Sequence, residues 1–187
     1  MCINILPVSI MSKLKAFLLM LWSIESHIRA NIAISKFFHR RIPILGRLLS
    51  MILDRLLLIL YGVDLTSDSI NVRALSISHP SGVLLGGNGV FSSGRVVVMS
   101  GVKFGGRKSN DPEYLAKHKQ QKVFELGDNV VIGTNAVVLG PVSICDNVIV
   151  ASMSLVNRSI TEPGVYIGVP AKKVSDQVDT SWIAHLK

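Results

Sequence analysis

Aliphatic residues recur at every sixth position between residues 126 and 156. A period of six fits neither the 3.6-residue repeat of a helix face nor the two-residue alternation of a half-buried strand, and it is typical of solenoids built from short repeats. Each hexad can form one short strand and one corner, with the aliphatic side chain inward and a small residue where the backbone turns. Three hexads then close one coil, which predicts a parallel β-helix. The inward positions are Leu126, Ile132, Val138, Ile144, Val150 and Val156, and small or turn-forming residues follow at Gly127, Gly133, Cys145, Ala151 and Asn157.

A noisier repeat of the same period covers residues 63–106. The two blocks together supply about 80 residues, or roughly four and a half coils of about 18 residues, so the β-helix is expected to span residues 63–174. One register in the first block places Leu65, Ile77 and Val83 inward, but it also places Asn71, Gly89, Arg95 and Gly101 there, which predicts a shift of register.

Residues 105–122 have lost the period, and the repeat resumes near Val123. This segment is therefore expected to loop out from one corner of the solenoid. Residues 175–187 follow the last repeat and are expected to form a tail, as a short helix or an extended cover. A cap is needed because an open final coil would expose strand edges and an apolar core.

Residues 1–62 carry a helical pattern. Apolar residues at three- and four-residue spacing start at Leu14, and a second stripe runs from Leu45 to Leu60, which predicts a helical hairpin before the β-helix. The apolar runs are too short and too charged for a bilayer span of about 20 residues. Two interpretations stay open for the hairpin: it packs on the solenoid end or on neighbouring subunits, or it lies on an anionic membrane face.

Composition indicates a globular chain with two basic regions. Hydrophobic residues make up 49% and charged residues 17%, which excludes a disordered chain, and the net charge of +8 is concentrated in residues 1–62 and 103–122. No nucleic-acid motif accompanies these regions, so nucleic acid is not the expected partner. Cys2 and Cys145 occupy unrelated positions, which favours a reducing compartment over a disulfide framework. A cytoplasmic location is expected, with peripheral contact at the inner membrane left open.

Residues 78–87, with the sequence SHPSGVLLGG, contain the candidate chemistry. They resemble the active-site segment of serine acetyltransferases, which are hexapeptide-repeat acyltransferases that use acetyl-CoA. The similarity runs from residue 63 to 106 and resumes from 126 to 174. The resemblance implies a mainly β fold, a left-handed parallel β-helix that assembles as a homotrimer.

The same resemblance implies direct acetyl transfer with His79 as general base and with neither a metal nor a covalent acyl-enzyme. Asp64 stands fifteen residues before His79, as the orienting aspartate does in that family. Fifteen residues are slightly less than one coil of three hexads, so the two side chains are expected to be neighbours on adjacent coils, where a carboxylate fixes the imidazole tautomer. The other interpretation of His79 is a turn histidine beside proline with no role.

Three departures from the family bear on the acceptor. The aspartate before the catalytic histidine is Ser78 here, Gly87 replaces a glutamate, and an Arg-His pair before the second block is missing. A zwitterionic amino acid would therefore meet fewer fixed charges. His118, in the basic segment, either replaces the missing histidine or is a solvent-exposed residue, and Tyr114 in the same segment is expected to stack on a sugar face.

The cofactor positions follow from the resemblance as well. It implies that the pantetheine arm of CoA lies in the groove between neighbouring subunits, against backbone groups. Lys172 and Lys173 are expected to meet the CoA phosphates, unless they are two solvated lysines. The positions that match the pantetheine contacts are Gly105, Gly106, Thr134 and Ala151.

The leading functional expectation is an acetyl-CoA-dependent O-acetyltransferase. Its acceptor would be a sugar hydroxyl of a bacterial surface polysaccharide or its precursor, as in the serine-acetyltransferase-like enzymes of capsule, O-antigen and colanic acid loci. Serine acetylation for cysteine synthesis is one alternative, and a noncatalytic scaffold that tolerates loss of His79 is another. A β-helical carbonic anhydrase is disfavoured because His79 lacks partner histidines at zinc-ligand spacing, so no metal is expected.

Overall fold

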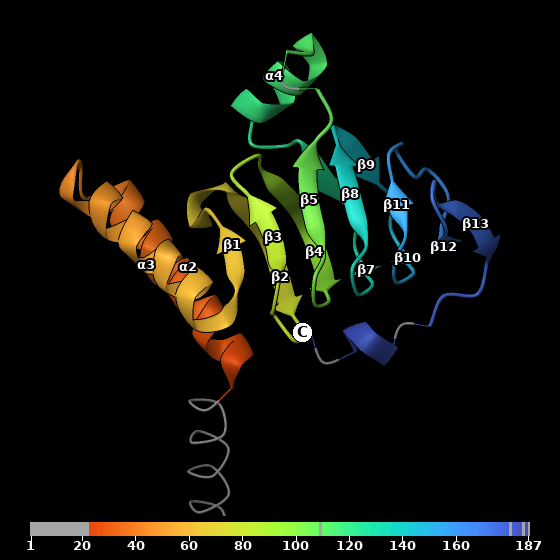
Figure 1. Cartoon of the computed structure of the whole chain (residues 1–187), viewed down its shortest axis with the longest axis horizontal. Coiled ribbons are helices and arrows are strands. Elements are labelled where there is room, and N and C mark those ends of the chain that lie inside the picture. Colours follow the sequence, from red (N-terminus) through yellow and green to blue (C-terminus); the bar gives the residue numbers. More distant parts are fainter. Residues whose placement is uncertain (1–22, 109, 180, 185, 187) are drawn as a thin grey trace, which may run out of the picture.

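A computed structural model describes residues 23–108, 110–179, 181–184 and 186 of the chain. The chain order is a helical hairpin, a β-helix interrupted by one helix, and a short tail. Figure 1 shows the hairpin at one end of the β-helix and the last strand at the other. No helix among the described residues is long and apolar enough to cross a membrane.

The hairpin consists of α2 (Ile24–Arg41) and α3 (Leu45–Tyr61). The first predicted helix begins in residues that lie outside the described ones, so only its part from Ile24 onward is seen. α3 ends where Gly62 adopts a left-handed backbone conformation with φ 67°, which costs glycine little. The chain then enters the first strand at Val63, as the repeat pattern predicted.

Two parallel sheets wind around one core. The first sheet runs β1 (Val63–Leu65), β3 (Val83–Gly86), β5 (Lys103–Gly106), β8 (Val137–Gly140) and β11 (Leu155–Val156). The second runs β2 (Ile70–Ile77), β4 (Val90–Val98), β7 (Val130–Ile132), β10 (Val148–Val150) and β12 (Gly164–Ile167), with β6 (Phe124–Leu126) and β9 (Val142–Ile144) branching from β4. All these pairs are parallel, and only β13 (Lys172–Ser175) pairs antiparallel, with β12.

The six predicted inward residues of the regular block are all buried, with at most 5% of their surface exposed. This confirms the hexad prediction. Small residues at the corners are needed because the coils stack closely: a Cβ on Gly133 would lie 2.6 Å from the backbone nitrogen of Ser152. The fold is thus a hexapeptide β-helix with N-terminal helices.

The two blocks differ in coil length. In the regular block Val130 pairs with Val148 and Val137 with Leu155, so each coil is three hexads long. In the first block Val63 pairs with Val83, so the first coil is longer than three hexads by two residues. These two additional residues explain why the period is noisy there and why the expected register had to shift.

The segment 105–122 is not a plain loop. Its first two residues extend β5, and Pro112–Lys119 form α4, which Figure 1 shows standing out beyond the end of β5. The Asp111 side chain caps this helix by accepting hydrogen bonds from the backbone N–H groups of Glu113 and Tyr114. Helical periodicity over eight residues is too short to be seen in the sequence, which is why the helix was missed.

The tail returns along the β-helix. A short 3-10 helix, η2 (Ser181–Ile183), and Leu186 pack their apolar side chains on Val97 and Val131, which point outward from the second sheet. The strand β13 crosses the expected boundary between β-helix and tail at residue 174. The last coil is thus covered by β13, while the tail itself covers outward-facing residues of the middle coils.

One ion pair joins the two repeat blocks across the α4 insertion. Asp128 accepts hydrogen bonds from the backbone N–H of Arg95 at 2.7 Å and from its guanidinium at 3.0 and 3.2 Å. These hydrogen bonds lower the pKa of Asp128 from 3.8 to about 2. Gly94 permits the contact, because a Cβ there would lie 2.4 Å from the Cα of Asp128.

We expect Asp128→Asn to reduce stability at neutral pH by roughly 1 kcal/mol, as for a partly exposed pair. Because the folded-state pKa lies below the unfolded value, the contribution is present above about pH 4 and disappears as the pH falls through about 2. Urea unfolding of both proteins should therefore show a midpoint difference at pH 7 that shrinks at pH 2. Glu113→Gln, at an exposed carboxylate without an ion pair, is the control. Equal differences at both pH values would refute the ionic contribution.

Candidate active site

His79 occupies a corner between the first and second coils. It follows β2 and precedes β3, its side chain is exposed, and its backbone is left-handed, with φ 53°. Asn129, Asn135 and Asn147 adopt the same conformation at corners of the regular block, so it marks a turn of the coil. Among the described residues His79 has no hydrogen-bond or ion-pair partner, so its ring is free to accept a proton from a bound molecule.

Two hollows flank His79, and both are also lined by Ile24 and Pro80. One, of about 470 Å³, lies toward the start of α2 and includes Ser23, Glu25, Ile77 and Ser78. The other, of about 540 Å³, lies toward the end of α3 and includes Leu60, Tyr61, Gly62, Ser81 and Ser100. The corner histidine thus separates two spaces that small molecules can enter.

The structure does not bring Asp64 to His79. Asp64 lies in β1 beside Leu84, five residues beyond His79, because the first coil is longer than the three hexads that were expected. Its carboxylate lies 3.7 Å from the guanidinium of Arg55 on α3. Within one chain, Asp64 and His79 are therefore not neighbours, contrary to the expectation. The contact that Asp64 makes with Arg55 connects β1 to α3.

Glu25 is a candidate that sequence reasoning missed. It lies in the first turn of α2 and lines the same hollow as Ser78 and His79. Its Oε1 atom is buried without a hydrogen-bond partner and lies 3.8 Å from Arg29. A buried carboxylate oxygen without a donor is costly, so it is suited to receive one from a ligand. No motif signals Glu25, because the contact depends on how the hairpin packs against the β-helix.

A second polar group near His79 also comes from the hairpin. Nδ1 of His27 lies 2.8 Å from the hydroxyl of Tyr61, and Tyr61 lines the second hollow. Of the other histidines of the chain, His39 lies 3.8 Å from Asp68, and His185 is outside the described residues.

The remaining expected acceptor residues are divided between two places. Ser78 lines the hollow of His79, with its hydroxyl 3.4 Å from that of Ser76. Gly87 follows the other end of β3, where a Cβ would lie 3.3 Å from the hydroxyl of Thr66. Ser78 is therefore part of the candidate site of this chain, and Gly87 is not.

Tyr114 and His118 lie on α4, beyond the end of the sheet opposite to the His79 corner (Figure 1). The Tyr114 ring is buried, its hydroxyl donates to Asn88 at 2.8 Å, and His118 stacks on it at a centroid distance of 5.7 Å. This corrects the prediction that Tyr114 stacks on a sugar: the ring anchors α4 to the β-helix. His118 is half-buried, not a freely solvated residue.

The positions expected to contact pantetheine have structural uses of their own. A Cβ on Gly106 would lie 2.8 Å from the Tyr114 ring, so Gly106 makes room for it. Gly105 pairs with Leu139 in the first sheet, the Thr134 carbonyl accepts from Met153, and the Ala151 N–H donates to Tyr166. The Thr134 hydroxyl donates to the sulfur of Met99 at 3.9 Å. All four positions therefore already make contacts within the fold.

The two lysines near the end of the β-helix differ in their surroundings. Lys173 forms ion pairs with Asp176 at 2.6 Å and Glu162 at 3.1 Å, and the hydrogen bonds to these carboxylates raise the pKa of Lys173. Lys172 is exposed, has no ion pair among the described residues, and lines a hollow of about 310 Å³ together with Arg158. Lys172 and Arg158 are thus the cations that a phosphate can reach.

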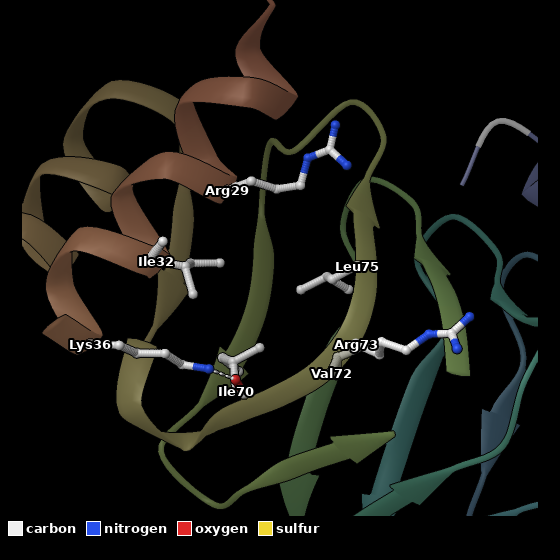
Figure 2. A pocket seen from close by; sticks show the side chains of 8 residues that line it. Arg29, Ile32, Lys36, Ile70, Val72, Arg73 and Leu75 are labelled. Atoms are coloured by element: carbon white, nitrogen blue, oxygen red, sulfur yellow. Dashed lines mark hydrogen bonds between the residues drawn. The ribbon is translucent and has the colours of Figure 1, made fainter. Parts of the chain in front are cut away.

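A hollow of about 270 Å³ between α2 and β2 is separate from the candidate site. Ile32, Val72 and Leu75 form its apolar lining (Figure 2). Lys36 spans its edge and donates to the carbonyl of Ile70, and burial together with the nearby charge of Arg40 lowers the pKa of Lys36. The Arg73 guanidinium points away from α2 in Figure 2, so the cations do not converge on one point. Among the described residues, no group of three His, Cys, Asp or Glu side chains is placed to hold a metal.

Residues 125–158 match the family model described as bacterial transferase hexapeptide (six repeats). The chain is 28% identical to the serine acetyltransferase of Synechococcus elongatus over 137 residues, which cover 73% of this chain and 51% of that protein. The chain thus spans about half the length of this relative.

Two solved serine acetyltransferases share the hexapeptide fold. The enzyme from Brucella abortus in complex with coenzyme A superposes with a TM-score of 0.67 at 17% identity, covering 81% of this chain and 56% of that one. The enzyme from Neisseria gonorrhoeae in complex with serine gives 0.63 at 24% identity, covering 80% and 56%. The shared fold agrees with a left-handed β-helix. The relatives named here are serine acetyltransferases, and a resemblance to polysaccharide O-acetyltransferases is not shown by them.

Proposed function

We propose that this chain transfers the acetyl group of acetyl-CoA to a hydroxyl group, with His79 as general base. The observation that carries the proposal is the position of His79, exposed and free of partners among the described residues at a corner between two hollows. The similarity to serine acetyltransferases, one of them solved with coenzyme A, supports the donor. Because the chain spans only about half of those proteins, the activity is our proposal for this chain.

In the proposed reaction the imidazole of His79 takes the proton of the acceptor hydroxyl as its oxygen attacks the thioester carbonyl of acetyl-CoA. A backbone N–H stabilises the negative charge on the tetrahedral intermediate. The C–S bond then breaks, and the CoA thiolate takes the proton back from the imidazolium. The products are the acetyl ester and CoA, and the chemistry uses no metal.

We expect His79→Ala to lower kcat by about 10²-fold or more, the usual contribution of a general base. The KM for acetyl-CoA should stay the same, because the variant removes a proton acceptor and no cofactor contact. His118→Ala is the matched control, since His118 stacks on Tyr114 at the other end of the sheet. If kcat is retained in His79→Ala and falls in His118→Ala, the general base is His118 on α4.

We propose L-serine as the acceptor. The similarity to serine acetyltransferases supports this acceptor. Glu25 supplies an acidic group for it, because its carboxylate lines the hollow of His79, where it can meet the ammonium of an amino acid. A carboxylate paired with an ammonium offsets the cost of burying either charge. The basic segment of α4 in a neighbouring copy is proposed to meet the carboxylate of serine.

Glu25→Gln should raise the KM for L-serine by about tenfold or more, the strength of a hydrogen bond between charged groups. The KM for acetyl-CoA should not change. Asp176→Asn, at an exposed carboxylate near the last strand, away from both His79 and α4, is the control. The readout is O-acetylserine measured by mass spectrometry, and an unchanged serine KM would exclude Glu25 from the acceptor site.

A saccharide hydroxyl is the second candidate acceptor. The observation that favours it is the neutral Ser78 side chain, which lines the hollow beside His79 where the serine acetyltransferases carry an aspartate. A panel of sugars, nucleotide sugars and polysaccharide repeats assayed beside L-serine distinguishes the two. Acetylation of a sugar with no O-acetylserine would replace the serine proposal.

We further propose that Lys172 binds the phosphates of CoA. Lys172→Gln should raise the KM for acetyl-CoA several-fold, with an effect that weakens at high salt because an exposed charge is screened. Lys173→Gln is the matched control, because Lys173 is already held by Glu162 and Asp176. Equal effects of the two substitutions would show that only net charge matters.

We propose a homotrimer with each site between neighbouring copies, because α4 and His79 lie at opposite ends of the sheet in one chain. The stacked coils present flat faces that can pack around a three-fold axis. Light scattering should give three times the chain mass of 20.3 kDa. A fully active monomer would contradict the shared site. The cytoplasm, where acetyl-CoA is available, is the proposed location.

A further inference from the structure

α3 presents most of its large apolar side chains to solvent. The residues it buries are Gly46, Ser50 and Leu57, and its contacts with α2 include a 2.7 Å hydrogen bond between the hydroxyls of Ser35 and Ser50. At 100° per residue, the opposite face carries large hydrophobic residues, with Met51 exposed by 64% and Ile59 by 77%. This outward face consists of Leu45, Leu48, Met51, Ile52, Leu56 and Ile59, with Leu58 and Leu60 exposed at its borders and Ile44 exposed just before the helix begins.

Other apolar residues of the hairpin are exposed as well. Ile42 is exposed next to Ile44, and Ile34 and Phe37 are exposed on α2. Figure 1 shows the hairpin at the edge of the molecule, with α3 clear of the strands along most of its length. A row of exposed apolar side chains along one face of α3 marks an interaction site.

The charges around the outward face are cationic. Arg41 and Arg47 are exposed near the turn and have no ion-pair partner among the described residues. Arg55 lies within the outward face, one turn from Met51 and from Ile59, and its guanidinium lies 3.7 Å from the carboxylate of Asp64. The two acids of the hairpin are not on this face: Asp54 accepts hydrogen bonds from Ser35 and Ser67, and Glu25 lies in the hollow of His79. The surface therefore combines apolar side chains with uncompensated positive charge.

We propose that the outward face of α3 docks the protein on an anionic lipid bilayer. A helix with one apolar face and flanking arginines lies in the plane of the interface, with its hydrophobic side chains among the acyl chains and its cations at the headgroups. α3, about 25 Å long, is too short to span a bilayer but suits this orientation. This inference is independent of the proposed acetyl transfer.

The charge pattern favours lipid over a second copy of this chain. In a symmetric pair of α3 helices each face meets itself, so the face of the second copy offers Arg41 and Arg47 no hairpin carboxylate to compensate them. An anionic headgroup layer supplies that compensation along the whole helix. The favoured partner is therefore a membrane surface rich in anionic phospholipid.

Flotation of the full chain with vesicles tests the proposal. Binding is expected to vesicles of phosphatidylcholine with phosphatidylglycerol and to be much weaker with phosphatidylcholine alone. Replacing Leu48 and Ile59 together by Glu should reduce binding by roughly tenfold or more, because it places charge in the apolar face. Leu115→Glu makes a matched change at an exposed leucine of α4 and should leave binding unchanged. Circular dichroism checks that each variant is folded.

The electrostatic part is tested separately. Arg41→Gln and Arg47→Gln should each weaken binding about fivefold at low salt, and Lys119→Gln on α4 should not. Absence of binding to the anionic vesicles would overturn the proposal. It would also be overturned if the Leu48 and Ile59 change had no effect, since adhesion would then follow net charge alone. A different result would assign the outward face to a second copy of the chain: the original protein does not bind vesicles, and the double variant has a lower oligomer mass than the original protein.

Discussion

Successive coils are held together by backbone hydrogen bonds such as that from Gly133 N–H to the carbonyl of Val150, at 2.8 Å. Parallel strands joined in this way lie about 4.8 Å apart, so each coil must repeat the path of the one before it. Inward aliphatic side chains then stack into one column, and corner residues must be small or tolerate left-handed backbone. Departures from this path are possible only at corners, where His79 and the α4 segment both occur.

The regular block could be predicted from its residues because local and global requirements agree there. The six aliphatic positions from Leu126 to Val156 are the core, and each coil takes the three hexads that the period requires. The helical hairpin was also predictable from its 3.6-residue stripes. The direction in which α3 faces was not, because a stripe shows that one side is apolar but not what covers it.

The candidate site was only partly visible in the sequence. His79 could be chosen from its motif, but the position of Asp64 depended on a coil length that the noisy block does not reveal. The longer first coil places Asp64 beside Leu84, where its carboxylate turns toward Arg55. Glu25 enters the site through the packing of a helix on the first coil, and such a contact leaves no pattern in a single sequence. Tyr114 was misjudged because an aromatic residue in a basic segment can equally be an anchor.

The α4 insertion between the two blocks also bears on how the chain folds. Contacts between neighbouring coils of the regular block join residues three hexads apart, whereas those between β4 and β7 join residues almost twice as far apart in the chain, across α4. Closing the longer loop costs more conformational entropy before any contact compensates for it. In a solenoid, where each coil touches only its neighbours, order spreads from the unit that forms first. Within each block the contacts join residues only about one coil apart. Each block is therefore expected to form on its own, and the joining of the two blocks across α4 is the expected late step of folding.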